Sequence, residues 1–217
     1  MKDKIARSGP TDRRERHARI LTAALEVFSK CSFGDATTDE IARRARVSKR
    51  DIYAEFPDKH AILAAVVSTV LQTGDENLQR VVADSCESIK SVQARLEIVG
   101  LALVSEILSP VTGFVSRLVS SESLEQPGIG ALYFESSYSR RNRLIAHVFS
   151  KQEAGAKRSN RRNDDINQAV KHYVALVTQL PHLTASVGVR EMWTPKSIEA
   201  HVRNAAKRLL MAYPTLA

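Results

Sequence analysis

The sequence predicts an all-α fold, because apolar residues recur at spacings of three and four through most of the chain. Glycine and proline are scarce, with 9 and 7 residues among 217, and no alternating apolar-polar run is bounded by hairpin turns. A chain of this length, 43% apolar, can form a small domain joined to a larger one. We therefore predict about nine helices, three of them in an amino-terminal domain (residues 1–60) and the others in a larger domain (residues 61–217).

The composition indicates the cellular compartment and limits the kinds of binding site that we expect. The longest apolar run, Ala61 to Leu71, is shorter than the ~20 residues that cross a bilayer, and residues 1–19 lack a signal-peptide pattern. Cys31 and Cys86 lie far apart without metal-ligand spacing. These features predict a cytoplasmic protein with no membrane partner, no metal and no cofactor. The net charge of +8 is compatible with a polyanionic partner, although a basic balance often reflects only solubility.

The first predicted helix begins near Asp12, which Glu15 follows at three residues, and continues to about Ser32 before Gly34 ends it. Its apolar stripe consists of Ile20, Leu21, Ala24, Leu25 and Phe28.

Two short helices follow, each opened by a polar cap. Thr37 and Glu40 form the Thr-x-x-Glu pattern of a capping box, in which each side chain bonds the other residue's free backbone N–H. Ser48 and Asp51 repeat the start signal, and Pro57 prevents the third helix from continuing. Helical spacing predicts buried faces made of Ile41, Ala42 and Ala45 in the second helix, and Ile52 and Phe56 in the third.

The tight turn at Arg46 and Val47 makes these helices cross steeply, which is helix-turn-helix geometry. If Ile52 and Phe56 point inward, the third helix exposes a face made of Lys49, Arg50, Tyr53 and Ala54. A helix about 10–12 Å wide enters the DNA major groove, where Lys and Arg can reach guanine edges or phosphates. Duplex DNA is therefore the predicted partner.

This segment resembles the DNA-binding domain of the TetR family of transcriptional regulators over about Arg13 to Val70. The resemblance lies in Thr37-Thr38-Asp39-Glu40-Ile41-Ala42, Ala45-x-Val47-Ser48-Lys49, Ile52-Tyr53-x-x-Phe56 and Lys59. It implies that Thr38 and Lys59 grip phosphates, and that Tyr53 touches backbone and base edges. The base-reading positions that it implies are Lys49, Arg50 and Asp51.

Arg46 departs from the family pattern, which usually has glycine in the turn. A non-glycine residue at positive φ costs roughly 1 kcal/mol, and this one adds a cation near the DNA.

Alternative roles stay open for several of these residues. Asp51 is equally compatible with a capping role, whereas Arg43 and Arg44 fit a solvated face better. Plain surface charge is the alternative for Lys49 and Arg50, but their place on the exposed face of a capped, groove-sized helix favours DNA contact. The leading arm either enters a minor groove or is a solubilising tail; its cations are Lys2, Lys4, Arg7, Arg13 and Arg14.

Asp58 can cap a fourth helix, and longer helices are predicted at about 91–108, 110–121, 130–151, 164–187 and 195–212. Arg117-Leu118-Val119 and the long last helices resemble the AefR-type carboxyl domain of TetR regulators. In the family the last two long helices form a four-helix bundle with a second copy. The resemblance therefore implies a homodimer interface, to which we assign the stripes Ile166, Val170, Tyr173, Val177 and Leu180, and Ile198, Val202, Ala205 and Leu209. The competing interpretation is that both stripes face their own core.

A cavity for a small, mostly apolar effector is expected in the same domain, with plain core as the alternative. Its candidate lining is Leu101, Leu108, Phe114, Leu118, Phe134, Tyr138 and Trp193. A second basic region is interpreted as a solvated face, with phosphate or acidic-lipid binding as the minority interpretation; it contains Arg140, Arg141, Arg143, Lys151, Lys157, Arg158, Arg161 and Arg162.

The sequence thus predicts a transcriptional regulator, with repression the expected outcome, that binds palindromic operator DNA as a homodimer and releases it when an effector binds. An enzyme is disfavoured, because the six histidines are scattered and no nucleophile elbow, zinc-protease, phosphate-loop or dinucleotide motif occurs. The remaining alternative is an accessory DNA-binding protein without an effector.

Overall fold

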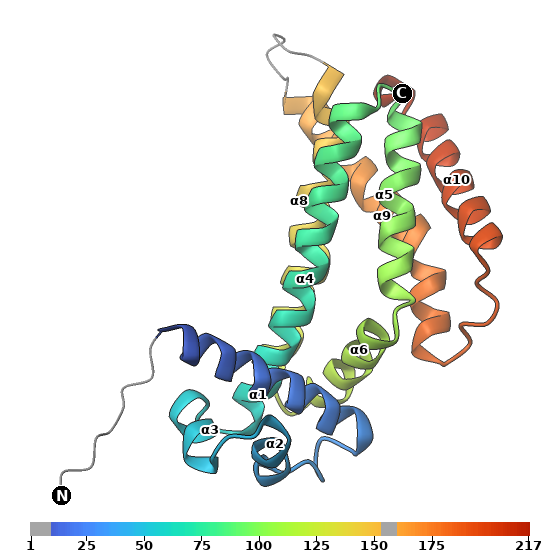
Figure 1. The fold of residues 1–217 in the computed structure, drawn as a ribbon. Helices are drawn as coiled ribbons and strands as arrows, with labels where there is room; N and C mark the ends of the chain where they lie inside the picture. Colours follow the sequence, from blue (N-terminus) through green and yellow to red (C-terminus); the bar gives the residue numbers. More distant parts are fainter. Residues whose placement is uncertain (1–9, 153–159) are drawn as a thin grey trace, which may run out of the picture. The chain divides into compact units, whose positions relative to one another are not determined.

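The computed structural model describes residues 10–152 and 160–217 and confirms the all-α prediction (Figure 1). Within these ranges the chain has no strand. It has nine helices when the uninterrupted helical run at residues 127–152 is counted as one helix and the short terminal turn Pro214–Leu216 is left out. The chain divides into two compact units between Thr69 and Val70, inside helix α4 (Lys59–Ser88). The division that we predicted after residue 60 lies earlier in the same helix.

The first unit contains α1 (Pro10–Lys30), α2 (Thr38–Ala45), α3 (Lys49–Glu55) and the first turns of α4. Its core contains the predicted inward residues of α1, α2 and α3 together with apolar residues of α4, and those with no exposed surface are Ile20, Ala24, Ile41, Ile52, Ile62, Leu63 and Val67. The predicted basic arm at residues 2, 4 and 7 lies outside the described residues.

The caps that bound these helices follow the sequence, with one correction. Ser48 and Asp51 form the full capping box, and the Asp58 carboxylate accepts a hydrogen bond from the Ala61 N–H at 2.8 Å. The Thr37 hydroxyl accepts from the Glu40 N–H at 3.2 Å, but Glu40 does not complete the predicted box. Its carboxylate bonds to two arginines instead.

The second unit consists of α5 (Val92–Ile107), α6 (Pro110–Glu122), α7 (Pro127–Phe134), α8 (Arg141–Ala146), α9 (Asn160–Ser186), α10 (Pro195–Ala212) and the remainder of α4. A π-helix, Glu135–Arg140, joins α7 to α8, and a 3-10 helix, His147–Gln152, follows α8. The helix predicted at 130–151 is therefore a composite of three helix types.

Helices α5, α9 and α10 pack side by side in this unit (Figure 1). Tyr173 on α9 is fully buried between them and donates its hydroxyl proton to the Leu96 carbonyl. The close approach requires Gly100, because a Cβ atom there would lie 2.3 Å from the Tyr173 hydroxyl. Burial raises the pKa of the Tyr173 phenol, so the group stays protonated and remains a donor.

Among the described residues, no single helix is both long and apolar enough to span a membrane. Only α5 and α6 taken together pass by length and composition, and they are bent by 65° at the break between them.

Candidate DNA interface and ligand pocket

The exposed face of α3 has the composition that the sequence predicts. Ile52 is fully buried and Phe56 nearly so, whereas the opposite face leaves Tyr53 49% exposed. Lys49, Arg50 and Ala54 are exposed beside it. The short helix therefore presents two cations and a phenol on one surface.

A hydrogen-bonded cap fixes the first turn of α3. The Asp51 carboxylate accepts from the Ser48 N–H at 3.1 Å and from the Ser48 hydroxyl at 2.5 Å. These bonds lower the pKa of the Asp51 carboxyl, so it is ionised at neutral pH. Of the two roles left open for Asp51, the structure shows the cap.

Two side-chain contacts hold α2 and α3 together at this surface. The Lys49 ammonium lies 2.8 Å from a carboxylate oxygen of Asp39, and the hydroxyls of Thr38 and Tyr53 are 3.3 Å apart. The hydrogen bond with Asp39 raises the pKa of the Lys49 ammonium. Asp39 is a residue that sequence reasoning missed, because its partner is ten positions away on another helix. Arg50 has no hydrogen bond or ion pair within the described ranges.

The structure corrects the interpretation of Lys59 as a phosphate contact. Its ammonium donates to the carbonyls of Phe33, Gly34 and Ala36 at 2.5, 3.0 and 2.9 Å, and it lies 4.5 Å from the centre of the Phe33 ring. An ammonium has three donors, and all three are used. Lys59 therefore fastens the α1–α2 loop to the start of α4.

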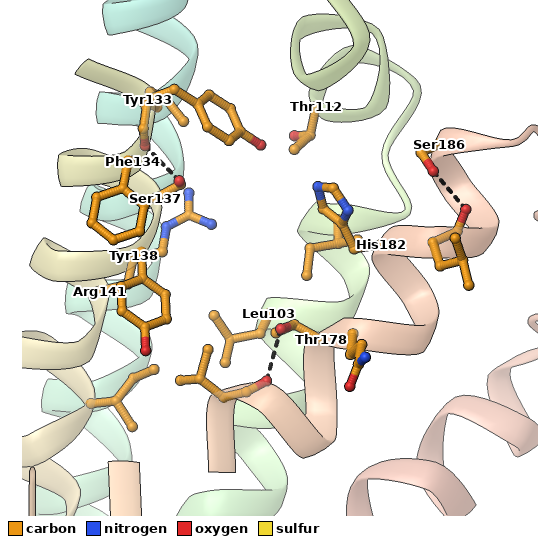
Figure 2. A pocket seen from close by; sticks show the side chains of 16 residues that line it. Leu103, Thr112, Tyr133, Phe134, Ser137, Tyr138, Arg141, Thr178, His182 and Ser186 are labelled. Atoms are coloured by element: carbon orange, nitrogen blue, oxygen red, sulfur yellow. Dashed lines mark hydrogen bonds between the residues drawn. The ribbon is translucent and has the colours of Figure 1, made fainter. Parts of the chain in front are cut away.

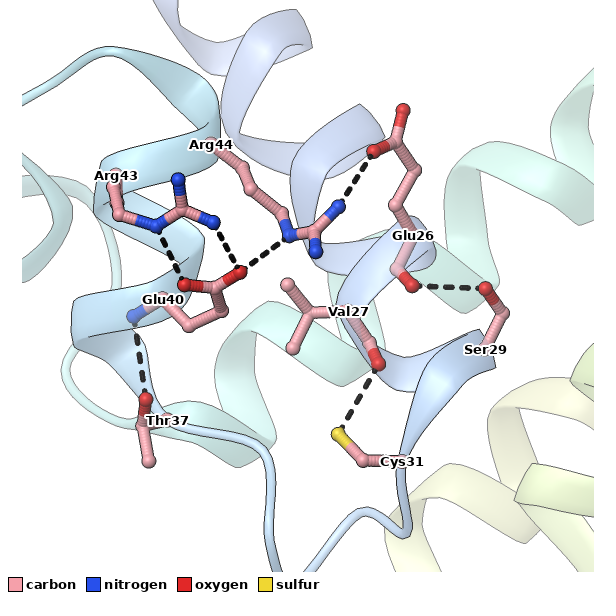
Figure 3. A network of polar contacts seen from close by, with 8 residues as sticks. All are labelled: Glu26, Val27, Ser29, Cys31, Thr37, Glu40, Arg43 and Arg44. Carbon is pink, nitrogen blue, oxygen red and sulfur yellow. Dashed lines mark hydrogen bonds and ion pairs between the residues drawn. The ribbon is translucent and has the colours of Figure 1, made fainter.

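The two arginines of α2, Arg43 and Arg44, are also paired with carboxylates (Figure 3). The Glu40 carboxylate accepts from Arg43 at 2.7 Å and from Arg44 at 2.6 Å, and Arg44 reaches Glu26 at 3.4 Å. Hydrogen bonds from Arg43 and then Arg44 lower the pKa of the Glu40 carboxyl to about 2. This pairing agrees with the solvated-face interpretation of the two arginines.

The turn between the helices contains the strained residue that the sequence predicts. Arg46 adopts φ 55° and ψ 47°, and it is the single positive-φ residue other than glycine in the described part of the chain. The left-handed geometry lets the backbone N–H groups at the turn bond to the last carbonyls of α2, as the Val47 N–H does with Ala42 at 3.1 Å.

The second unit contains a pocket of about 520 Å³ (Figure 2). Of the predicted lining residues, Phe134 and Tyr138 line it, with ring centroids 5.2 Å apart. The other predictions are wrong for this pocket: its wall does not include Leu101, Leu108, Phe114, Leu118 or Trp193. The apolar wall comes instead mainly from Leu71, Leu103, Ile107, Ile145, Val174 and Leu183.

One predicted surface cation lies in this wall, which corrects its assignment to a solvated face. Arg141 is 6% exposed, and it donates to Asp75 at 3.1 Å and to Glu106. Gly74 makes the arrangement possible, because a Cβ atom there would lie 2.2 Å from a Glu106 oxygen. Burial, opposed by the attraction and hydrogen bond of Arg141, raises the pKa of the Glu106 carboxyl. Both partners lie on other helices, Asp75 on α4 and Glu106 on α5, so the charge pattern around Arg141 in the sequence could not reveal them.

The structure also corrects most of the predicted dimer stripe. Seven of the nine predicted residues are buried in the chain's own core, and so they present no face to a second copy: Ile166, Val170, Tyr173, Val177, Val202, Ala205 and Leu209. Ile198 is partly buried. Leu180 is 44% exposed and belongs to another row on α9. This row, which we call the α9 stripe, consists of Leu176, Leu180 and Leu183 of α9 and of Val187 directly after its last residue, all exposed.

Comparisons with known proteins agree with both units. The model of the bacterial regulatory proteins of the tetR family matches residues 20–66, and that of the AefR-like transcriptional repressor C-terminal domain matches residues 94–215. Over 125 residues the chain is 28% identical to TtgW, an uncharacterised HTH-type transcriptional regulator of Pseudomonas putida, covering 58% of this chain and 87% of that one.

The HTH-type transcriptional regulator SrpR of Pseudomonas putida is also 28% identical over 125 residues. That match covers 58% of this chain and only 55% of SrpR. A solved structure of a TetR-family transcriptional regulator from Mesorhizobium loti superimposes with a TM-score of 0.81 at 19% identity, covering 92% of this chain and 97% of the other. This likeness concerns the fold.

Proposed function

Because the chain belongs to the TetR family of transcriptional regulators, we propose that it represses transcription by binding palindromic operator DNA as a homodimer and that a small molecule releases it. The observation that carries the proposal is the capped helix α3, whose one exposed face presents Lys49, Arg50 and Tyr53 beside Thr38 of α2. These four side chains are the proposed DNA contacts, with Lys49 and Arg50 reading base edges.

The second unit supplies the two further parts of the proposal. The α9 stripe is an exposed apolar row whose three helical members are spaced by four and three residues, as in a helix packed against a second helix. A two-fold dimer would pair two copies of α3 with two half-sites about one helical turn, ~34–36 Å, apart. The 520 Å³ pocket is the proposed effector site.

A polarisation titration of the full chain on fluorescent DNA from its own promoter tests this function. We expect affinity to fall steeply with salt, with a slope of about −0.9 for each phosphate contact, and scrambled DNA to bind far more weakly. Arg50→Ala should reduce specific binding, whereas Arg203→Ala, which removes a half-exposed cation from the second unit, should not. Binding indifferent to both salt and sequence would refute the proposal.

A further inference from the structure

The pocket wall contains one permanent charge. Among the described lining residues, Arg141 alone is an arginine, lysine or carboxylate. It follows directly after the π-helix Glu135–Arg140, whose residues Ser137 and Tyr138 also line the pocket. π-helices are rare and occur mostly at functional sites. Figure 2 shows the Arg141 guanidinium on the side of the cavity opposite His182.

Arg141 retains hydrogen-bonding capacity toward the cavity. A guanidinium has five N–H groups, and here Nε donates to Asp75 and Nη2 to Glu106. Nη1 has no hydrogen-bond partner among the described residues. It also keeps some accessible surface, because the fully buried polar atoms without a partner do not include it. The side chain is only 7% exposed and lines the pocket. Two carboxylates thus hold the guanidinium in place while its remaining donors are available to a ligand.

The rest of the wall suits an apolar body. The stacked rings of Phe134 and Tyr138 lie on the same side as Arg141, and aliphatic side chains of α5 and α9 complete the surface. Hydroxyl groups of Thr112 and Tyr133 add neutral polar contacts. A ligand with one acidic end and a flat or flexible hydrocarbon body matches this distribution.

We infer that the effector is an apolar monocarboxylic acid, aromatic or aliphatic, whose carboxylate accepts hydrogen bonds from Nη1 of Arg141. The inference rests on the proposed function, because it takes the pocket to be the effector site. A neutral amide of the same shape offers Arg141 a weaker acceptor, since hydrogen bonds between charged groups are roughly twice as strong as neutral ones.

Glu106, which accepts from Nη2 of Arg141, is one of the two carboxylates whose negative charge opposes the acid. Asp75 and Glu106 are matched by Arg141 and by Arg140, whose Nε lies 3.3 Å from Asp75. An incoming carboxylate therefore adds one uncompensated negative charge to the site. Removing the charge of Glu106 while keeping its shape should relieve that repulsion, and the amide oxygen of glutamine can still accept from Arg141.

Calorimetric titration of the full chain with matched probes tests the inference. The probes are 2-naphthoate and octanoate, each paired with its primary amide. We expect at least one acid to bind about tenfold more tightly than its amide. Glu106→Gln should strengthen binding of that acid by about fivefold and leave the amide unchanged, and Arg141→Lys should remove most of the preference for the acid. The matched control is Arg143→Gln, which changes an exposed arginine two positions away and should alter neither.

The outcomes separate the ligand class from the function. Equal binding of acid and amide, or no acid binding at about 1 mM, overturns the inference while specific, salt-dependent DNA binding still upholds the regulator. Selective acid binding by a chain that does not recognise its promoter refutes the regulator and leaves the carboxylate site standing. If Arg141→Lys does not fold by circular dichroism, Glu106→Gln decides, and an unchanged acid affinity in that variant overturns the inference.

Discussion

Single residues at the helix-turn-helix affect the side chains that we propose as DNA contacts. Lys49 points from the exposed face of α3 but is already paired with Asp39, at 2.8 Å. An exposed ion pair of this kind contributes little to stability, because water screens it and both side chains lose freedom. We expect a larger effect on binding, because the ion pair with Asp39 competes with a base or a phosphate for the Lys49 ammonium.

Asp39→Asn should therefore strengthen operator binding. We expect the dissociation constant at low salt to fall by about two- to fivefold, because Lys49 is released and a negative charge near the phosphates is removed. Polarisation titration measures it. Asp164→Asn, the same charge change at an exposed position of the second unit, serves as the control. An affinity that is unchanged or weaker in Asp39→Asn would show that Asp39 does not restrain Lys49.

The turn residue Arg46 gives a prediction about stability. At φ 55° glycine has no steric penalty, so Arg46→Gly should raise the free energy of unfolding by about 0.5–1 kcal/mol. Gly188→Ala is the matched opposite, because Gly188 has φ 81°, where alanine is strained and stability should fall. Urea unfolding monitored by circular dichroism measures both. A less stable Arg46→Gly would mean that the arginine side chain stabilises the turn by more than its backbone strain costs.

At the scale of elements, the sequence located the helices well because their ends are local chemistry. Ser48, Asp58 and Thr194 each cap the predicted helix through bonds that span three residues. The contacts that escaped prediction are nonlocal. The three carbonyls around Lys59 come from a loop more than twenty positions away, and no periodicity encodes their convergence.

Helix α9 shows the same limit for its two faces. Ile166, Val170 and Val177 form one apolar row, and the α9 stripe forms another, so helical spacing alone could not decide which row is core. Packing against α5 and α10 decides it in favour of the first row. The pocket was likewise predicted only at Phe134 and Tyr138, because the rest of its wall depends on how α4, α5 and α9 pack.

The ion cluster that joins α4, α5 and α8 makes a prediction about packing. In Gly74→Ala the new Cβ atom would lie 2.2 Å from a Glu106 oxygen and 2.9 Å from Nη2 of Arg141, so the buried pair must move. We expect a loss of about 1–3 kcal/mol in the free energy of unfolding. Gly128→Ala is the control, because nothing lies within 4 Å of its Cβ position in α7 and alanine favours a helix. If both variants are equally stable in urea, the cluster is not tightly packed against α4.

At the scale of the whole molecule, the proposed recognition of DNA depends on the assembly of two copies. In the proposed function a single α3 would cover one half-site, and its few exposed contacts would give limited affinity and specificity. Two copies linked through the second unit would add their contacts on a palindrome, and the link converts the second contact into an intramolecular event. The α9 stripe, with Val187 65% and Leu183 56% exposed, is the apolar surface available for that link.

Charge in the α9 stripe should separate the two subunits of the proposed dimer. In Leu176→Glu/Leu180→Glu each copy would bring two carboxylates into an apolar contact, where unpaired charges are strongly unfavourable. Light scattering should then report the 24.0 kDa chain in place of twice that mass. Leu124→Glu is the control, because Leu124 is 87% exposed and lies outside the stripe, so the assembly should persist. Operator affinity should fall in the same variant whose molecular mass falls, since each monomer then binds its half-site alone. A double variant that keeps twice the chain mass would place the interface on another surface, and one that loses mass without losing affinity would show that a single α3 suffices.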